Sequence, residues 1–506
     1  MCGILSSFGK SDITLVDFAK RLATIQSRGP DDSVIYSPAK GIILGFNRLA
    51  INGNDDESGQ PFKIGDITLI CNGEIFNHKE LEDELNYTPI SGSDCEVLIP
   101  AYHRWGPLEM CNHLDAEFAF VLYDRKLSRI VAARDPYGVR PLFISHGGLI
   151  ASELKAIAPL RAEQFKPGHV YCEDRGTTCY TPYRRPFVNA APGHDISPPY
   201  PDDTVYTLLC QSVKKRMMCE NGGVCCLLSG GLDSSLVASL AQRYSAEPIH
   251  TFSIGLPGSP DLECARIVAD HIGSVHHEVM ATEDEFIGAI PDVIRAIESY
   301  DTTTVRASVG NYLIAKHIQL KTEFKVVLNG DYADEVFGGY LYLRLAPSDS
   351  EFGAERNKLL NNIHYFDSLR SDRCICAWGL EARAPYADKS LVEYVLRLQD
   401  SITSCRTKQE KWILRSAFEG MGLIPDEILW RQKEAFSDGV SSTTRSWYKI
   451  AADVHAPMTE DEYYKKVFVD AYGDNNLGII PYKWMPQWGD ATDPSARTLK
   501  VYNGSS

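Results

Sequence analysis

The sequence predicts an α+β N-terminal part followed by an α/β part with a parallel sheet and a helical C-terminal portion. Three observations predict this fold class. Short apolar runs bounded by Gly, Asp or Pro dominate the chain up to about residue 187. From Thr204, apolar runs of strand length alternate with helical stretches of about 10–15 residues, which is typical of βαβ units. Beyond about Asn357 the pattern is mostly helical.

Composition marks the boundary between the two parts. Residues 188–203 are rich in Pro, Gly and Asp and poor in large apolar side chains, which is typical of an interdomain linker. At about 100–200 residues per domain, a chain of 506 residues allows two to four domains. We therefore expect one domain over 1–187 and a second over 204–506, joined by the linker 188–203.

The individual elements follow from apolar runs and their periodicity. In the first part we expect strands at 66–71, 117–123, 130–133 and 141–145, and helices at 16–25 and 79–85. In the second part we expect strands at 224–228, 249–254, 275–279 and 325–328. The helices expected between and around them are 204–218, 233–244, 261–271, 283–299 and 309–320.

The overall charge excludes several classes of partner. The chain has 51 Lys and Arg against 67 Asp and Glu, a net charge of −16, which argues against a nucleic-acid footprint or a polybasic membrane anchor. No window resembles an apolar membrane span, and the N-terminus lacks the basic segment of a secretory signal. We expect a cytoplasmic enzyme without nucleic-acid or membrane partners. The sequence leaves the oligomeric state open, with a homodimer as one candidate.

The fourteen cysteines contain no C-x-x-C pair, so most are interpreted as buried thiols in a reducing compartment. Cys2 is the exception, because removal of the initiator Met would leave a thiol beside its own α-amine. An α-amine has a pKa of about 7.7–8.0 and can serve as the general base that deprotonates the thiol. Taken alone, a cysteine at position 2 is more often incidental.

Five motifs in the first 150 residues change that interpretation: Arg28–Asp31, Asn47–Ile51, Asn72–His78, Gly92–Glu96 and Ala133–Gly138. Singly, the Asn-Gly and Gly-Pro-Asp pieces are also common turns. Together, in this order, they resemble the glutamine amidotransferase domain of the N-terminal-nucleophile (Ntn) hydrolases. The resemblance implies an αββα sandwich. One departure is Ser27, where the family has His before Arg-Gly-Pro.

The resemblance implies a glutamine site made of Cys2, Arg48, Asn72, Gly73, Glu74 and Asp94. Arg48 would pair with the substrate carboxylate through its fork of donors, and Asp94 would hold the α-ammonium. Glu74 would assist positioning. Attack by the thiolate places negative charge on the amide oxygen, for which the Asn72 side chain and the Gly73 N–H are the oxyanion donors.

A second candidate site follows the strand expected at 224–228. Its loop consists of Leu228, Ser229, Gly230, Gly231, Leu232, Asp233, Ser234 and Ser235. Backbone N–H groups at the start of a helix bind phosphate, and the glycines permit close approach. The loop is neither a Walker A motif nor a dinucleotide fingerprint. It resembles the pyrophosphate loop of N-type ATP pyrophosphatases, and the alternative is an ordinary Ser-rich helix cap.

Further motifs follow in order: Phe252–Leu256, Tyr300–Arg306, Leu328–Glu335, Trp378–Pro385 and Trp430–Gly439. The whole set resembles the glutamine-hydrolysing asparagine synthetases over nearly the full chain. That resemblance implies ATP and Mg²⁺ as substrate and cofactor, and glutamine and aspartate as the other substrates. It implies attack of the aspartate side chain on ATP, giving β-aspartyl-AMP and pyrophosphate, and displacement of AMP by ammonia.

Roles in this second site are expected as follows. Ile254 would lie beside the adenine, and Asn329 and Gly330 beside the phosphates. Lys433 and Arg306 are the expected cations at the leaving pyrophosphate. The hydroxyls of Thr303 and Thr304 are expected to donate to the substrate. The expected ligands of Mg²⁺ or of the substrate ammonium are Asp233, Asp334 and Glu335. Arg383 would hold a substrate carboxylate or pair with Glu381.

One segment departs from the family. Where the family has Ser-Gly-Glu-Gly-Ser-Asp-Glu, this chain has Asn329-Gly-Asp331-Tyr332-Ala-Asp-Glu335. In the family, the glutamate belongs to the catalytic centre. Asp331 is one methylene shorter, so its carboxylate reaches about 1.5 Å less far, and a misplacement of about 1 Å can lower the reaction rate on the order of 10²-fold. Tyr332 is much larger than Gly. These departures predict a slower synthetase or one tuned to another acceptor.

Three alternatives remain at this point. β-Lactam-forming synthetases share the architecture but lose the nucleophile, so the presence of Cys2 with Arg48, Asn72 and Asp94 argues against that class. A glutamine-dependent amidotransferase acting on another carboxylate is harder to exclude. The third alternative, a degenerate paralogue that senses nucleotide without turnover, is motivated by the departures at 329–332.

Overall fold

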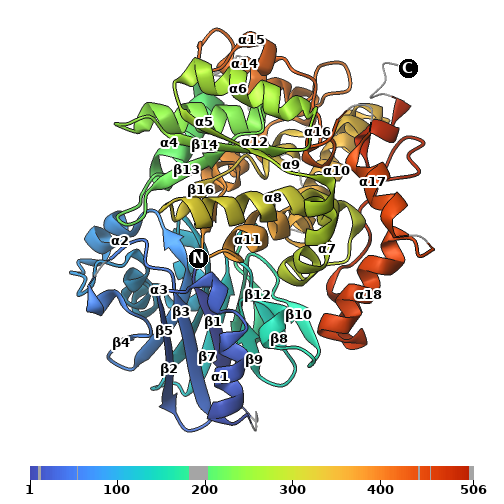
Figure 1. The fold of residues 1–506 in the computed structure, drawn as a ribbon. Helices are drawn as coiled ribbons and strands as arrows, with labels where there is room; N and C mark the ends of the chain where they lie inside the picture. The colour runs from blue at the N-terminus through green and yellow to red at the C-terminus, as the bar shows by residue number, and fades with distance from the viewer. Residues whose placement is uncertain (10–12, 54, 182–202, 443–444, 456, 501–506) are drawn as a thin grey trace.

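The computed structural model describes residues 1–9, 13–53, 55–181, 203–442, 445–455 and 457–500. The expected linker 188–203 lies outside these residues except for its last position. Figure 1 shows two lobes, with the N-terminal strands in one and a sheet surrounded by helices in the other. No helix in the described part of the chain is both long and apolar enough to cross a membrane.

The N-terminal lobe contains two six-stranded antiparallel sheets. The strand order of the first is β10 (Ala162–Gln164), β8 (Phe143–Ser145), β9 (Leu149–Ala151), β1 (Gly3–Ser7), β3 (Ile42–Arg48) and β2 (Asp32–Ala39). The order of the second is β12 (Gly176–Cys179), β11 (His169–Cys172), β7 (Arg129–Arg134), β6 (Ala116–Asp124), β5 (Ile67–Ile75) and β4 (Phe62–Ile64). The helices of this lobe are α1 (Leu15–Ala23), α2 (His78–Leu85) and α3 (Leu98–His113).

Alternation along the strands builds the layers of this lobe. Ile70 of β5 packs with Phe46 of the first sheet, so one face of β5 lies between the sheets. Its neighbour Leu69 packs with Leu98 and Tyr102 of α3 on the outer face. Because strand side chains alternate between faces, one apolar strand serves two cores. With α1 packed outside the first sheet, this is the expected αββα sandwich.

The C-terminal lobe is built on a parallel five-stranded sheet. Its order is β15 (Val275–Met280), β14 (His250–Gly255), β13 (Val224–Leu227), β16 (Val326–Leu328) and β17 (Glu381–Arg383). On one face lie α4 (Asp203–Arg216), α5 (Leu232–Tyr244) and α6 (Pro260–Ile272). On the other lie α7 (Glu283–Ile297), α8 (Thr302–Lys321) and α11 (Asp367–Cys376). The expected α/β class with a parallel sheet is confirmed.

Two differences from the expected elements matter for function. The strand β17 follows Asn357, in a region expected to be mostly helical, and it adds an edge to the sheet. The helix α8 begins at Thr302 rather than at residue 309, because the Asp301 carboxylate caps it by accepting from the Thr304 N–H at 2.9 Å. The remaining helices are α9 (Ala333–Phe337), α10 (Asp349–Asn362), α12 (Lys389–Arg397), α13 (Asp400–Thr403), α14 (Trp412–Phe418), α15 (Asp426–Leu429), α16 (Phe436–Gly439), α17 (Trp447–Val454) and α18 (Glu460–Tyr472).

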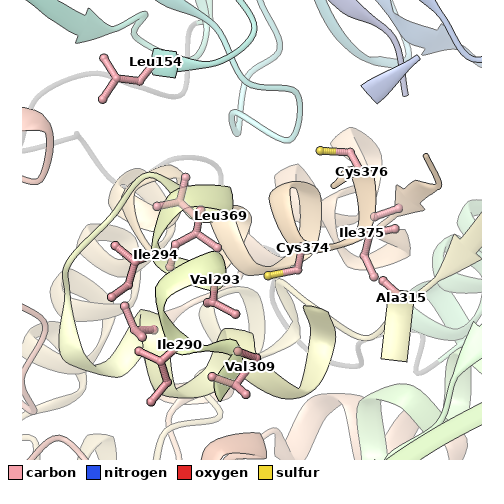
Figure 2. Packing of buried hydrophobic residues seen from close by; sticks show 14 of the residues in the cluster. Leu154, Ile290, Val293, Ile294, Val309, Ala315, Leu369, Cys374, Ile375 and Cys376 are labelled. Carbon is pink, nitrogen blue, oxygen red and sulfur yellow. The ribbon is translucent and has the colours of Figure 1, made fainter. Parts of the chain in front are cut away.

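The helix α11 lies in the middle of the C-terminal core. Figure 2 shows Leu369, Cys374 and Ile375 of α11 beside side chains of α7 and α8, such as Ile294 and Val309. All these side chains are at most 4% exposed. All fourteen cysteines are free thiols, and most of them, Cys374 included, are buried as packing side chains.

Candidate active sites

The first site is a pocket in the N-terminal lobe. All six residues expected to bind glutamine line it: Cys2, Arg48, Asn72, Gly73, Glu74 and Asp94. They arrive from the start of β1, the end of β3, the strand β5 and the turn before α3. The Asn-Gly pair is therefore part of a strand and not of a hairpin turn. A Cβ on Gly73 would lie 2.6 Å from the Glu117 oxygen, so the neighbouring strand requires glycine there.

Asn72 connects the nucleophile to a free hydrogen-bond donor. Its Oδ1 accepts from the Cys2 N–H at 2.9 Å, while its buried Nδ2 has no partner among the described residues. A buried donor without a partner costs free energy unless a ligand uses it. Because the carboxamide lies beside the thiol, Nδ2 is placed as an oxyanion donor. Burial raises the pKa of the Cys2 thiol to about 11, so the thiol needs a base to react.

The polar residues of this pocket are held by their own partners. The Arg48 guanidinium donates to the Gly53 carbonyl at 2.5 Å. Asp94 accepts from the Ile75 N–H at 2.6 Å, and burial raises its pKa. Glu74 accepts from Asn52 at 2.7 Å, and burial also raises the pKa of Glu74. Each carboxylate is thus oriented by a hydrogen-bond donor from another segment of the same lobe.

Arg28 of the Arg-Gly-Pro-Asp motif links this pocket to the other lobe. Its Nε donates to the Cys2 carbonyl at 3.0 Å. The same guanidinium contacts Glu153 at 2.7 Å and Asp372 of α11 at 2.8 Å. Arg28 also lies 3.0 Å from the Cys376 sulfur. Glu153, Asp372 and Cys376 lie close enough together to hold a metal ion, but the Arg28 guanidinium already supplies a positive charge to this cluster. Arg28 is fully buried, so the motif has a bridging role.

The second site lies at the carboxyl ends of the parallel strands, where open α/β sheets bind ligands. Its pocket takes most of the loop after β13, together with Ile254, Asn329 and Gly330. Gly230 has φ +70°, and a Cβ there would lie 2.4 Å from the Ala265 nitrogen, so the loop conformation requires glycine. The Ser234 Oγ accepts a hydrogen bond from the Ser229 N–H at 3.1 Å, which ties the loop to the first turn of α5. The loop leads directly into α5, and the first N–H groups of a helix form a binding site for phosphate.

Two acids and two lysines occupy the centre of this pocket. Asp334 lies 2.6 Å from Lys411 and 2.7 Å from Lys433, and Asp233 also pairs with Lys411. Burial alone would raise the pKa of Asp334, but the two ammonium groups outweigh it and lower that pKa. The carboxylates of Asp334 and Asp233 in turn raise the pKa of Lys433 despite its burial. The two carboxylates therefore keep Lys433 charged, which suits binding of a polyphosphate.

The same acids fit a divalent cation. Asp233 Oδ1 is buried and has no hydrogen-bond partner within the described ranges. Carboxylate oxygens beside a phosphate loop are the ligands that Mg²⁺ prefers. Asp233 and Asp334 are therefore carboxylates of the kind that could hold this ion, and their role as Mg²⁺ ligands stays a prediction.

Threonines and acids complete the wall. Thr303 Oγ1 is buried without a partner among the described residues and faces the pocket, whereas the Thr304 hydroxyl donates to Asp301 at 2.8 Å. Glu335 accepts from Tyr340 at 2.5 Å. Burial and the neighbouring Asp367 and Asp334 raise the pKa of Glu335 to about 8.

Arg306 does not lie where the sequence analysis places it. The pocket side of α8 consists of Thr303, Thr304, Ala307, Asn311 and Ile314, which share one helix face. Arg306 points from a different face and pairs with Glu460 at 2.5 Å and Asp493 at 2.7 Å. It is 4% exposed and held on both sides. The prediction of a pyrophosphate contact at Arg306 is therefore corrected.

Arg383 is a second correction. It lies on β17 beneath the first pocket, where its guanidinium meets Glu74 at 3.1 Å and Glu381 at 2.7 Å. It also donates to the Arg216 carbonyl at 2.9 Å. The side chain is fully buried and does not line the second pocket. Of the two expected roles, the pairing with Glu381 is the one the structure shows, and Arg383 joins the lobes.

Sequence reasoning missed several pocket residues. Lys411, Arg370, Asp367, Tyr340 and Arg431 all line the second pocket. Lys411 carries no signal in the sequence, because its positive φ of +58° at the cap of α14 is seen only in the structure. Lys411, Arg370 and Arg431 each pair with a carboxylate that is distant in the sequence, namely Asp233, Asp331 and Asp261.

Comparison with known proteins assigns each lobe to a family. The glutamine amidotransferase domain family matches residues 1–171, and the asparagine synthase family matches 204–361 and 345–479. Asparagine synthetase [glutamine-hydrolyzing] from Gallus gallus is 36% identical over the full length of both chains. The enzymes of the same name from Bos taurus and Homo sapiens are also 36% identical over the full length of both chains. The chain belongs to the glutamine-hydrolysing asparagine synthetases.

Membership of this synthetase family gives the departures at 329–332 a structural setting. Tyr332 adopts φ +76°, the left-handed region that favours the family's glycine. Its ring is 1% exposed, and its hydroxyl lies 2.5 Å from the Ser368 Oγ. Tyr332 is thus packed into the core. Asp331 keeps a carboxylate in the pocket.

Proposed function

We propose that this chain makes L-asparagine from L-aspartate, using ATP and ammonia released from L-glutamine. Residues 1–187 would release the ammonia and residues 204–506 would activate the aspartate. The observation that carries the proposal is the coexistence of two assembled pockets. One presents a thiol with a free oxyanion donor, and the other presents a phosphate loop with two buried lysines.

In the first half-reaction, the Cys2 sulfur attacks the glutamine side-chain amide. Asn72 Nδ2 and the Gly73 N–H stabilise the oxyanion, and ammonia leaves when the tetrahedral intermediate collapses to a thioester. Arg48 and Asp94 hold the two ends of the amino-acid group. Water then hydrolyses the thioester to glutamate.

The base for this attack would be the α-amine of Cys2 after removal of Met1. With Met1 in place, the Cys2 nitrogen is an amide that donates to Asn72 Oδ1 at 2.9 Å. A free amine at the same point keeps that contact and gains a lone pair within reach of the thiol. We expect the intact mass of the purified protein to lack Met1, and its retention in a fully active enzyme would contradict this role.

In the second half-reaction, the aspartate side chain attacks the α-phosphate, giving β-aspartyl-AMP and pyrophosphate. Lys433 and Lys411 offset the charge of the leaving group, and Thr303 donates through its free hydroxyl. Asp233 and Asp334 would hold Mg²⁺, which offsets phosphate charge when bound. Ammonia then displaces AMP.

The test separates the two halves. Purified protein is incubated with aspartate, ATP and Mg²⁺, with either glutamine or ammonium as nitrogen source, and asparagine, AMP and pyrophosphate are quantified. We expect equal amounts of all three products from both sources. Cys2→Ala should abolish the glutamine-dependent reaction and retain the ammonium-dependent one, with Cys219→Ala as a matched control outside both pockets. ATP binding without AMP release would instead support a nucleotide sensor.

The setting of the enzyme is also a proposal. The free state of all fourteen cysteines supports a cytoplasmic location, because reducing compartments keep thiols unpaired. We propose small-molecule partners, and we retain a homodimer as the assembly to be tested by light scattering.

A further inference from the structure

The loop 329–332 between β16 and α9 contains three departures from the family pattern, and each of the three contacts α11. The pairs are Asn329 Nδ2 with Ser371 Oγ at 2.7 Å, Asp331 Oδ1 with Arg370 at 2.5 Å, and Tyr332 hydroxyl with Ser368 Oγ at 2.5 Å. The three partners, Ser368, Arg370 and Ser371, lie within four consecutive positions on a single turn of α11. We call these three pairs the loop clamp.

Backbone strain indicates that the loop clamp holds the loop against a preference. A non-glycine residue at φ +76° is strained, and such a conformation persists when the surroundings over-determine it. The Tyr332 side chain meets that condition, because its ring is buried and its hydroxyl is bonded to Ser368. Glycine at this position would have no side chain to hold.

The other half of the loop clamp is rigid. Leu369, Cys374 and Ile375 fix α11 in the core against α7 and α8 (Figure 2). Close-packed interiors move little, so the polar side of α11 is a fixed frame. The loop clamp therefore transfers the position of a packed helix to the loop.

The consequence falls on Asp331. Its Oδ1 is occupied by Arg370, while its Oδ2 is buried and has no partner among the residues that the structure describes. The side chain is 10% exposed and lines the second pocket. One oxygen is thus anchored and the other is free to face a ligand. Anchoring matters more for Asp331 than for a glutamate, because the shorter arm cannot correct a misplaced backbone.

We propose that Ser368, Arg370 and Ser371 are positioning residues that fix Asp331 for the ammonia step. The proposal rests on the proposed function. In that step the ammonia nitrogen forms a bond to the β-carbonyl carbon of β-aspartyl-AMP, and the bond from that carbon to the phosphate oxygen breaks. AMP leaves with the electron pair, and the proton lost by nitrogen goes to Asp331 Oδ2. The chain thus carries its own arrangement, with a shorter acid on a held loop.

The test measures the two chemical steps separately in the full-length enzyme. Exchange of labelled pyrophosphate into ATP, dependent on aspartate, reports adenylation. Asparagine formation from ammonium reports the ammonia step. We expect Ser368→Ala and Tyr332→Phe to lower kcat for asparagine by about tenfold while exchange stays within about twofold, since small misplacements of a reacting group are costly. A purely structural role would lower both rates together and would overturn the proposal.

A matched control removes a buried tyrosine hydroxyl elsewhere. Tyr342 donates to Glu355 at 2.9 Å and does not line the second pocket. Tyr342→Phe should therefore leave the ratio of the two rates unchanged. Thermal melting of every variant shows that it is folded. If Tyr342→Phe shifts the ratio as much as Tyr332→Phe does, the loop clamp has no special role.

The variant Asp331→Glu distinguishes two explanations of the shorter acid, because they predict opposite changes in the rate of asparagine formation. If Asp331 is a defect, restoring the family's glutamate raises the rate of asparagine formation. If the loop clamp fits the shorter acid, the longer side chain is misplaced, and we expect a loss of about tenfold. A gain or no change would overturn the proposal. A wild-type enzyme with neither exchange nor asparagine formation would overturn the proposed function itself, which keeps the two failures apart.

Discussion

The two pockets handle charge in opposite ways. Around Cys2, the groups nearest the reacting amide are neutral donors, namely the Asn72 carboxamide and the Gly73 N–H. In the second pocket, Asp233 and Asp334 are interlocked with Lys411 and Lys433. The difference matches the substrates, since glutamine presents a neutral amide to the nucleophile whereas ATP brings a polyanion. A charged pocket must be held together by its own ion pairs until the ligand arrives.

The pockets also differ in how the chain assembles them. The first draws its six expected residues from the opening 94 positions, with Glu381 as a contribution from the other lobe. The second draws on segments that run from Leu227 to Trp484. Short motifs therefore describe the first site well. The second depends on packing that places distant side chains together.

The largest effect on activity is expected from the loss of a lysine in the second pocket. Lys433→Ala removes one of the two cations that face Asp334, so the leaving pyrophosphate loses a stabilising charge. We expect kcat for asparagine formation from ammonium to fall by about 10³-fold. Glutaminase activity should persist. Lys433→Arg is the matched control, and a loss of glutaminase in Lys433→Ala alone would show that the two pockets are not independent.

The corresponding change in the first pocket is Asn72→Ala. It removes the free Nδ2 donor and the acceptor of the Cys2 N–H. Loss of one oxyanion donor costs about 10²–10³-fold in kcat, so glutamine hydrolysis should fall by that factor. Asparagine formation from ammonium should be unaffected. Equal losses with both nitrogen sources would assign Asn72 to structure rather than to the oxyanion.

A smaller effect is expected at the contact between the lobes. Asp372→Asn weakens the anchor of Arg28, which holds the Cys2 carbonyl. We expect glutamine-dependent synthesis to fall by about tenfold and ammonium-dependent synthesis to change by less than about threefold, because only the nucleophile is displaced. Initial rates with the two nitrogen sources measure this ratio, and an unchanged ratio would contradict the bridging role.

The smallest effect on activity is expected at Arg306. Its ion pairs with Glu460 and Asp493 face away from the pocket. Arg306→Lys loses the fork geometry, so the free energy of unfolding should fall by about 1–3 kcal/mol. The KM for ATP should stay within about twofold. Chemical denaturation and steady-state kinetics provide both numbers, and a tenfold rise in KM without destabilisation would restore Arg306 to the site.

The sequence was sufficient where short-range patterns carry the information. Apolar period and turn residues predicted four of the five strands of the parallel sheet, but only β5, β6, β7 and β8 among the twelve strands described in the N-terminal lobe. The loop that starts at Ser229 runs from β13 into the first turn of α5, as expected. The start of α8 was placed too late, because polar residues at Thr302–Thr304 hide a helix that Asp301 caps. The strand β17 was missed because three residues are too few to show a period.

The sequence by itself determined the class of each lobe and the chemical groups available, since these follow from local periodicity and composition. Through the family resemblance, its compact motifs also predicted the residues that line the first pocket. Only the tertiary structure decided which face of α8 meets the pocket, that Arg383 pairs with Glu74, and that Lys411 joins Asp233 and Asp334. The physical reason is that the direction of a side chain depends on the packing of its element against partners a hundred or more residues away. No local pattern encodes that packing.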